Sequence, residues 1–134
     1  MLKQVSIYAE NKKGTFQSIT QILQQNNINI LGSVTNDSAE YGIIRMIVSD
    51  TDKTIRSLTE SGYLCRVTDI LGVEMEDETG NLNKLLISLS DGNISVDYIY
   101  LSFNRVTGKP ILILHTDDIF EVESYLRSKG YSLL

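Results

Sequence analysis

Tryptophan is absent from this chain of 134 residues, and proline, cysteine and histidine each occur only once. A single cysteine, Cys65, cannot form an internal disulfide, so the fold must be stable without one. The lone histidine, His115, and the lone thiol offer no set of nitrogen and sulfur ligands for a metal ion. We therefore expect neither a metal nor another cofactor.

Long apolar runs are also lacking. No segment approaches the roughly 18 apolar residues of a membrane-spanning helix. The first residues, MLKQVSIYAEN, contain no apolar stretch typical of a signal peptide. We expect no membrane association and, by default, a cytoplasmic location. No phosphate-binding loop or dinucleotide-binding fingerprint occurs either.

Positive charge is scarce in the second half of the sequence. Residues 1–66 contain seven Lys or Arg and six Asp or Glu, whereas residues 67–134 contain five and eleven, so the net charges are +1 and −6. Acidic surfaces repel phosphate backbones, which argues against a nucleic acid partner. Tyr98 and Tyr100 have too few basic neighbours to form a platform for stacking bases.

The sequence does contain an order of strand and helix patterns that occurs twice. Alternating apolar residues predict strands, and apolar residues three or four apart predict helices. The first half gives, in order, strand 3–9, a helix from about Thr15, strand 28–35, a turn at 36–42, strand 43–49, helix 50–62 and strand 63–76. The second half gives a helix with its apolar stripe at Leu82, Leu85, Leu86 and Leu89, then strands 94–103 and 109–116, helix 117–130 and a short final strand.

The two halves match at a spacing of 66 residues, which places Gly14 on Gly80, Phe16 on Leu82 and Gly42 on Gly108. Near the end the spacing becomes 68, and we attribute the two additional residues to the last helix. The repeat predicts an α+β chain of two ferredoxin-like βαββαβ repeats, residues 1–67 and 68–134. Each repeat would be an antiparallel sheet with both helices on one face.

A polar loop with a glycine precedes the first helix of each half. The first half reads IYAENKKGTFQSITQILQQNNINI, and the second half contains DETGNL followed by NIS. These segments resemble the loop, helix and second-strand start of the ACT domain, a small-molecule-sensing module. The positions that carry the resemblance are Asn11, Gly14, Thr15 and Phe16 with Ile28–Ile30, and Asp77, Gly80, Asn81 and Leu82 with Asn93–Ser95. Lys13 and Thr79 stand where ACT domains often have proline.

The resemblance implies a tandem ACT protein with a regulatory role. ACT domains typically bind amino acids, as in aspartokinase, phosphoglycerate dehydrogenase and small subunits of acetolactate synthase. They pair side by side, and the ligand usually lies between two units, held by the loop of one and the strand start of its neighbour. The ligand-binding residues so implied are Asn11, Lys13, Gly14, Thr15, Phe16, Asn29, Ile30, Asp77, Thr79, Gly80, Asn81, Leu82 and Ser95. The expected partners are an amino acid, a second copy in a homodimer and an enzyme of amino acid metabolism.

The chemistry of these loops suits such a ligand. Backbone N–H groups at a helix N-terminus bind a carboxylate, and Gly14 and Gly80 allow the backbone to approach it. Asn11, Asn29 or Asp77 could accept hydrogen bonds from an ammonium group. The loops differ in charge: NKKG is cationic and DETG is anionic, so Coulomb's law favours the first for a carboxylate. The other interpretation is that each loop is only a turn that begins a helix.

The remaining polar residues favour structural roles. His115 and Cys65 have no partner residues that would activate them, and we interpret both as structural. Asp50 or Asp52 before one helix, and Asp117 and Asp118 before another, are typical helix caps. Because no nucleophile and base occur together, we expect a protein that is not an enzyme.

Two hypotheses follow. In the first, the chain binds an amino acid and transmits its presence through association. In the second, it is a ligand-independent interaction or assembly subunit of an amino-acid metabolic enzyme. The absent proline and the anionic second loop motivate the second hypothesis.

Overall fold

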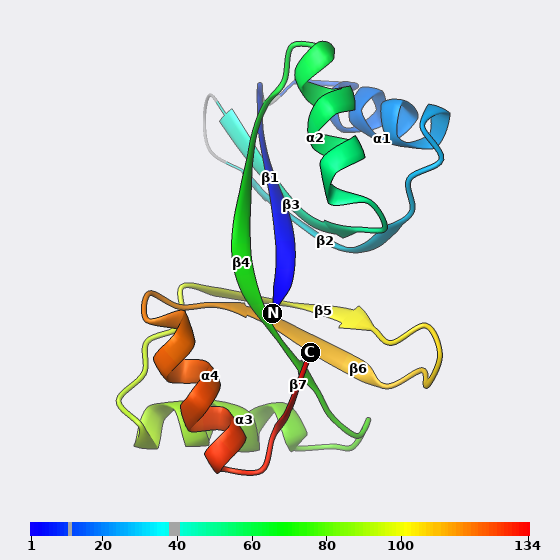
Figure 1. Ribbon diagram of the computed structural model, residues 1–134. Helices are drawn as coiled ribbons and strands as arrows, with labels where there is room; N and C mark the ends of the chain where they lie inside the picture. The colour runs from blue at the N-terminus through cyan, green and yellow to red at the C-terminus, as the bar shows by residue number, and fades with distance from the viewer. Residues whose placement is uncertain (11, 38–40) are drawn as a thin grey trace. The chain divides into compact units, whose positions relative to one another are not determined.

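The computed structural model describes residues 1–10, 12–37 and 41–134. It shows an α+β fold with antiparallel strand pairs and four helices (Figure 1). The chain divides into two compact units. The N-terminal unit is Lys3–Thr68, and the C-terminal unit is Asp69–Leu134 together with Met1–Leu2. Each unit is described by itself.

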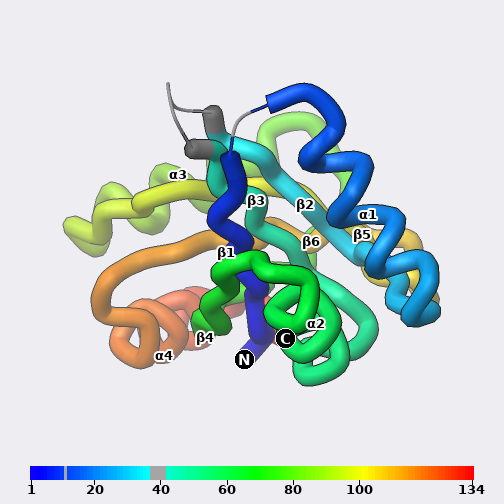
Figure 2. Tube along the Cα trace, turned by 90° about the horizontal axis from the view of Figure 1, so that it is seen from above, coloured from blue at the N-terminus to red at the C-terminus, as the bar shows by residue number. Residues whose placement is uncertain are grey.

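The N-terminal unit has the order strand, helix, strand, strand, helix, strand. Its elements are β1 (Leu2–Glu10), α1 (Thr15–Gln25), β2 (Ile30–Asp37), β3 (Tyr41–Val48), α2 (Thr51–Glu60) and the first part of β4 (Leu64–Glu74). β3 pairs antiparallel with both β1 and β2. The helices α1 and α2 contact each other and are seen from above in Figure 2. The core consists of Val5, Ile7, Ala9, Ile19, Leu23, Ile28, Ile44, Met46, Val48 and Leu58.

The C-terminal unit repeats this order. The second part of β4 is followed by α3 (Asn81–Asp91), β5 (Tyr98–Phe103), β6 (Pro110–His115), α4 (Ile119–Ser128) and β7 (Ser132–Leu133). β6 pairs antiparallel with β4 and β5, and β7 pairs antiparallel with β4. Its core consists of Leu71, Val73, Leu85, Leu89, Leu112, Leu114, Val122, Leu126 and Leu133.

Backbone hydrogen bonds repeat between the units at the spacing that the sequence predicts. Asn27 and Asn93, 66 positions apart, both have φ 55° and directly follow the C-cap residues of α1 and α3. The next residue in each case donates its N–H to a leucine carbonyl over 2.9 Å: Ile28 to Leu23, and Ile94 to Leu89. The duplication is therefore present in local geometry as well as in apolar pattern.

The two additional residues lie in a hairpin and not in the last helix, so that prediction is wrong. α2 and α4 both have 10 residues. Asp37 pairs with Gly42 across one hairpin, whereas Phe103 pairs with Pro110 across the other. Four positions, 38–41, separate the first pair and six, 104–109, the second. Gly42 therefore corresponds to Pro110 and not to Gly108.

Other predicted boundaries shift by a few residues. β5 begins at Tyr98, so residues 94–97 of the predicted strand precede it. The predicted turn at 36–42 is shorter, because β2 continues through Asp37 and β3 begins at Tyr41; its residues 38–40 lie outside the described residues. Phe16 and Leu82, the first members of the helix stripes, are 43% and 44% exposed and are not core residues.

The two predicted aspartate caps differ. At α2, the Lys53 N–H donates to Asp50 Oδ1 at 3.0 Å, so Asp50 caps the helix. Asp118 occupies the equivalent position at α4 but its side chain forms no capping hydrogen bond. Position alone therefore did not determine the cap.

This difference gives a matched prediction. Asp50→Ala should lower the free energy of unfolding by about 1 kcal/mol, because it removes a capping hydrogen bond. Asp118→Ala should cost about 0.3 kcal/mol, the lower end of a carboxylate's interaction with the helix dipole. Urea denaturation of both variants measures the difference. Equal losses would mean that the Asp50 contact contributes nothing beyond charge.

Candidate functional site

A glycine in the left-handed conformation begins the first helix of each unit. We call residues 10–15 the first Gly loop and residues 76–81 the second. Gly14 has φ 87° and Gly80 has φ 91°, and each occupies the N-cap position without a side-chain cap. A Cβ at either glycine would meet nothing within 4 Å. The conformation, rather than crowding, therefore calls for glycine.

The two loops share one hydrogen-bond pattern. In the first Gly loop, the Lys12 N–H donates to the Glu10 carbonyl at 2.9 Å and the Thr15 N–H to the Lys12 carbonyl at 3.2 Å. In the second Gly loop, the Glu78 N–H donates to the Glu76 carbonyl at 3.0 Å and the Asn81 N–H to the Glu78 carbonyl at 3.2 Å. The same two backbone hydrogen bonds thus recur among different side chains.

Each loop presents the start of a helix to its surroundings. The N–H groups of the first helical turn have no acceptor within a helix, and the helix dipole gives this end a partial positive charge. With glycine at the N-cap, no side-chain oxygen competes for these donors. Such an end can bind an anionic group such as a carboxylate.

Charge distinguishes the first Gly loop from the second. Lys12 Nζ lies 2.9 Å from Glu10 Oε2, and this hydrogen bond and the Glu10 charge raise the pKa of Lys12. Lys13 is exposed and makes no ion pair among the described residues. A cavity of about 340 Å³ borders the loop, lined by Tyr8, Ala9, Glu10, Lys12, Thr15, Gly62, Tyr63 and Leu64.

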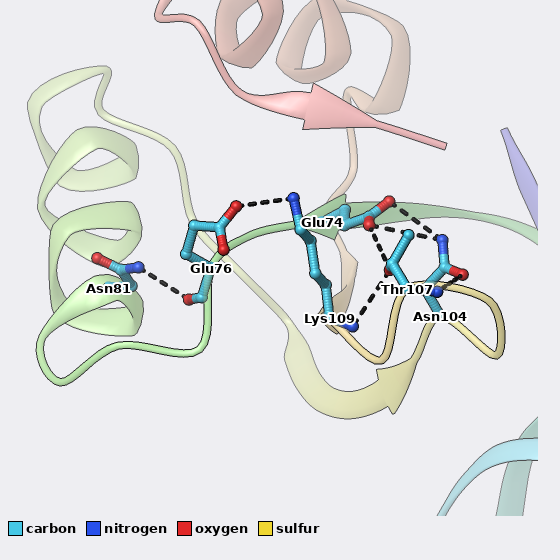
Figure 3. A network of polar contacts seen from close by, with 6 residues as sticks. All are labelled: Glu74, Glu76, Asn81, Asn104, Thr107 and Lys109. Atoms are coloured by element: carbon cyan, nitrogen blue, oxygen red, sulfur yellow. Dashed lines mark hydrogen bonds and ion pairs between the residues drawn. The ribbon is translucent and has the colours of Figure 1, made fainter.

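The second Gly loop is fixed by a polar network (Figure 3). Asn81 Nδ2 donates to the Glu76 carbonyl at 2.8 Å, and Lys109 Nζ lies 2.7 Å from Glu76 Oε1. The Glu76 carboxylate raises the pKa of Lys109. Nearby, Thr107 Oγ1 donates to Glu74 Oε1 at 3.1 Å. The turn of the β5–β6 hairpin is thereby tied to the end of β4.

The second Gly loop also borders an apolar cavity that the sequence did not indicate. Its volume is about 210 Å³, and its lining combines the loop with Met75, Leu82, Leu101, Phe103, Pro110 and Leu112. Leu101 and Phe103 are two residues apart in the predicted strand 94–103, so alternation places them on one face of it. Their periodicity could not show that this face continues beside the second Gly loop.

The predicted residues at the strand starts lie away from the loops of their own units. Asn29 donates its N–H to Ser49 Oγ at 2.9 Å, close to the start of α2. Ile30 packs against the core. Ser95 borders a cavity of about 310 Å³ with Thr116, Asp117 and Asp118. Among the described residues, each unit keeps its Gly loop and its strand start in separate cavities.

The other predicted binding residues belong to the loops themselves. Thr15 and Asn81 are the first residues of α1 and α3, and Thr79 is exposed directly before Gly80. Phe16 and Leu82 place large, half-exposed apolar side chains beside their glycines. Asn11 lies outside the described residues.

His115 and Cys65 have structural surroundings. His115 Nδ1 lies 2.8 Å from Asp97 Oδ2, and the imidazole stacks on Tyr98 with 5.1 Å between ring centroids. Cys65 packs against the N-terminal core, and burial raises the pKa of its thiol. In the described part of the chain, no three metal-ligating side chains come together, and no helix has the length and apolar character needed to cross a bilayer.

Comparisons with known proteins agree with this architecture. A family model described as "ACT domain pair" matches residues 1–128. The solved structure of protein BT0572 from Bacteroides thetaiotaomicron is similar, with 30% identity, a TM-score of 0.90, and coverage of 99% of this chain and 91% of that one. No curated protein matches the sequence.

Aspartate kinase regulatory subunits share the fold at lower identity. The ligand-free subunit from Thermus thermophilus is 12% identical with a TM-score of 0.67, covering 93% of this chain and 87% of that one. The subunit from Thermus flavus is 13% identical with a TM-score of 0.63, covering 93% and 88%. The family model covers almost the whole chain, so this protein belongs to the ACT domain pair family.

Proposed function

We propose that the protein is a non-catalytic regulator that binds a free amino acid and passes its presence on through association. Each ACT repeat, residues 1–67 and 68–134, would contribute one Gly loop. As the family resemblance implies, the ligand would lie where ACT units meet. The output would be a change in the affinity for a partner enzyme of amino acid metabolism or for a second copy in a homodimer. A ligand produces such a change only if it binds the two states unequally.

One observation carries this proposal: α1 begins at a left-handed glycine, uncapped, beside the exposed cation of Lys13. A helix start without a side-chain cap and a positive charge together suit the carboxylate of an amino acid. The second Gly loop has the same two backbone hydrogen bonds and a left-handed glycine but carries Thr79 where the first has Lys13. The first Gly loop is therefore our choice for the carboxylate.

Membership of the ACT domain pair family supports a regulatory role in general. The names of the fold neighbours, which are regulatory subunits of aspartate kinase, are consistent with it. They do not name the amino acid that this chain would bind.

A thermal-shift screen against the twenty amino acids at millimolar concentration tests the proposal. A ligand present at about 100 times its Kd adds roughly 2.7 kcal/mol to the stability of the folded protein. We expect the melting temperature to rise with one amino acid or a few related ones. Gly14→Asn should abolish this rise, because asparagine tolerates the left-handed conformation while its side chain blocks the approach to the backbone.

Matched variants of the second Gly loop provide the controls. Lys13→Glu should weaken binding about tenfold, equivalent to 1.4 kcal/mol, whereas Thr79→Glu at the equivalent position should not. Gly80→Asn should likewise leave the shift intact. The proposed site is wrong if no amino acid raises the melting temperature of the wild-type protein. It is also wrong if variants of the two loops change amino acid binding equally.

The assembly-subunit hypothesis has its own supporting observation. Val106, at the tip of the hydrogen-bonded β5–β6 turn, is 95% exposed, and Phe120 at the start of α4 is 70% exposed. Large apolar side chains this exposed are candidates for contact with another protein. Under this hypothesis the protein forms a stable complex that no amino acid affects, and Val106→Asp weakens it.

A further inference from the structure

We propose that the C-terminal unit has a second binding site, for a small molecule that joins a cationic amine to a branched or aromatic apolar group. The site is the apolar groove beside the second Gly loop. The second Gly loop is one of the two loops that the proposed function names, and this inference goes beyond that function in the charge of the ligand and in a site built from one unit alone.

The groove has an apolar floor and wall. Pro110 and Leu112 are buried at its base, while Leu82, Leu101 and Phe103 are 44%, 52% and 47% exposed. An apolar ligand in the hollow would remove exposed surface of these three side chains from water, which is favourable. The volume of about 210 Å³ lies below the roughly 300–1,000 Å³ of drug-sized sites, which suits a ligand the size of one amino acid.

The rim of the groove is anionic. Glu76 is paired with Lys109 at 2.7 Å, so its charge is compensated. Asp77 and Glu78 also line the groove, and neither carboxylate has an ion pair or hydrogen bond among the described residues. Two uncompensated negative charges therefore lie next to an apolar hollow.

The size of the charges decides which end of a ligand the rim attracts. The start of α3 contributes about half a positive charge, whereas Asp77 and Glu78 contribute two full negative charges at neutral pH. The sum is negative, so a ligand carboxylate is repelled and a ligand ammonium is attracted. The net negative charge of the rim therefore favours a cationic ligand.

The groove wall is held by strand pairing, because Leu101 pairs with Leu112 and Phe103 with Pro110, and hydrogen bonds also hold the turn of this hairpin. Asn104 Oδ1 accepts the N–H groups of Val106 at 2.9 Å and Thr107 at 3.1 Å. Thr107 in turn donates to Glu74 on β4 at 3.1 Å (Figure 3). A preformed wall reduces the entropy that a small ligand loses on binding.

The N-terminal unit lacks this combination, which provides an internal comparison. By strand register, Thr35 opposite Ile44 takes the place of Leu101 opposite Leu112. Lys12 takes the place of Glu78 in the shared loop pattern. One polar and one cationic residue thus replace an apolar and an anionic residue. The site belongs to the C-terminal unit alone.

Three probes with one alkyl group and different charges test the proposal: isoamylamine, isoamyl alcohol and isocaproate. Isothermal titration should show binding of isoamylamine, binding at least tenfold weaker for the alcohol, and none for the carboxylate. Methyl resonances of Leu82 and Leu101 should shift with the amine. The proposal is overturned if the carboxylate binds as well as the amine, or if the amine does not bind at millimolar concentration.

Variants separate this site from the first Gly loop. Asp77→Asn with Glu78→Gln should weaken amine binding at least tenfold, and Leu101→Thr, which introduces the residue of the N-terminal unit, should abolish it. Lys13→Glu should leave amine binding unchanged while amino acid binding falls, so either proposal can fail alone. These side chains are exposed, and melting without ligand verifies folding. A further result would overturn the small-molecule site: concentration-dependent dimerisation that Leu101→Thr weakens, with no amine binding, would assign the groove to a second copy.

Discussion

Leu126→Ala should lower the free energy of unfolding of the C-terminal unit by about 2–5 kcal/mol. Leu126 is 0% exposed on α4 and belongs to the core between the helices and β4, β6 and β7. Truncation removes apolar contacts and leaves a cavity that a close-packed core fills only in part. A unit of about 65 residues has a small core, so this loss is a large part of its stability.

Leu58 is the matched position in the N-terminal unit. It is also 0% exposed, lies on α2 and is 68 residues before Leu126, at the spacing of the second helices. Leu58→Ala should therefore cost a similar amount. Phe120 lies on α4 but is 70% exposed, so Phe120→Ala should change the free energy of unfolding by no more than about 0.5 kcal/mol.

Native-state hydrogen exchange is the appropriate measurement, because it resolves stability along the chain. If the units unfold independently, Leu126→Ala accelerates exchange in β4, β5 and β6 and leaves β1, β2 and β3 unchanged. If the units unfold together, both variants accelerate exchange throughout. A loss below about 1 kcal/mol for Leu126→Ala would contradict the position of this side chain in the core.

The sequence predicted the order of elements and the apolar stripes of the helices, because both follow from the spacing of apolar residues. Alternation and 3.6-residue spacing locate strands and helices without knowledge of their neighbours. The shared spacing of 66 residues also predicted that Gly14 and Gly80 would be equivalent. Their left-handed conformation follows from glycine before a helix and after a short polar loop.

Contacts between distant segments were not accessible. The sequence matched Gly42 with Gly108 because both are glycines near a turn, but strand register matches Gly42 with Pro110. The cap at Asp118 failed for a related reason: a side-chain hydrogen bond depends on rotamer and local backbone as well as on position. Leu101 and Phe103 read as one face of a strand, and only the fold shows what borders that face.

Gly92→Ala should destabilise the C-terminal unit by about 1–3 kcal/mol through overpacking. Gly92 is the C-cap residue of α3 with φ −81°, a conformation open to any residue. The obstacle is steric, because a Cβ there would lie 2.7 Å from Cζ of Tyr125 and 3.0 Å from its hydroxyl. The ring cannot retreat freely, since its hydroxyl donates to the Ser88 carbonyl at 2.6 Å and its ring packs against the core.

In the N-terminal unit, the position equivalent to Gly92 has a larger side chain and the position equivalent to Tyr125 has a smaller one. Asn26 is the C-cap residue of α1, 66 positions before Gly92, and Ser57 stands 68 positions before Tyr125. The N-terminal unit thus has asparagine and serine at the two positions where the C-terminal unit has glycine and tyrosine. We infer that the two positions are coupled, so the effect of Gly92→Ala should depend on residue 125.

The coupling predicts a reversal of sign. In the Tyr125→Ser background no ring opposes the new Cβ, and Gly92→Ala should stabilise the protein by about 0.4–1 kcal/mol by restricting the unfolded chain. Urea denaturation of the wild type, both single variants and the double variant completes the cycle. An equal effect of Gly92→Ala in both backgrounds would show that the ring is not the obstacle. A reversal would show that the halves compensate for volume between these two positions, while their Gly loops share backbone hydrogen bonds and differ in charge.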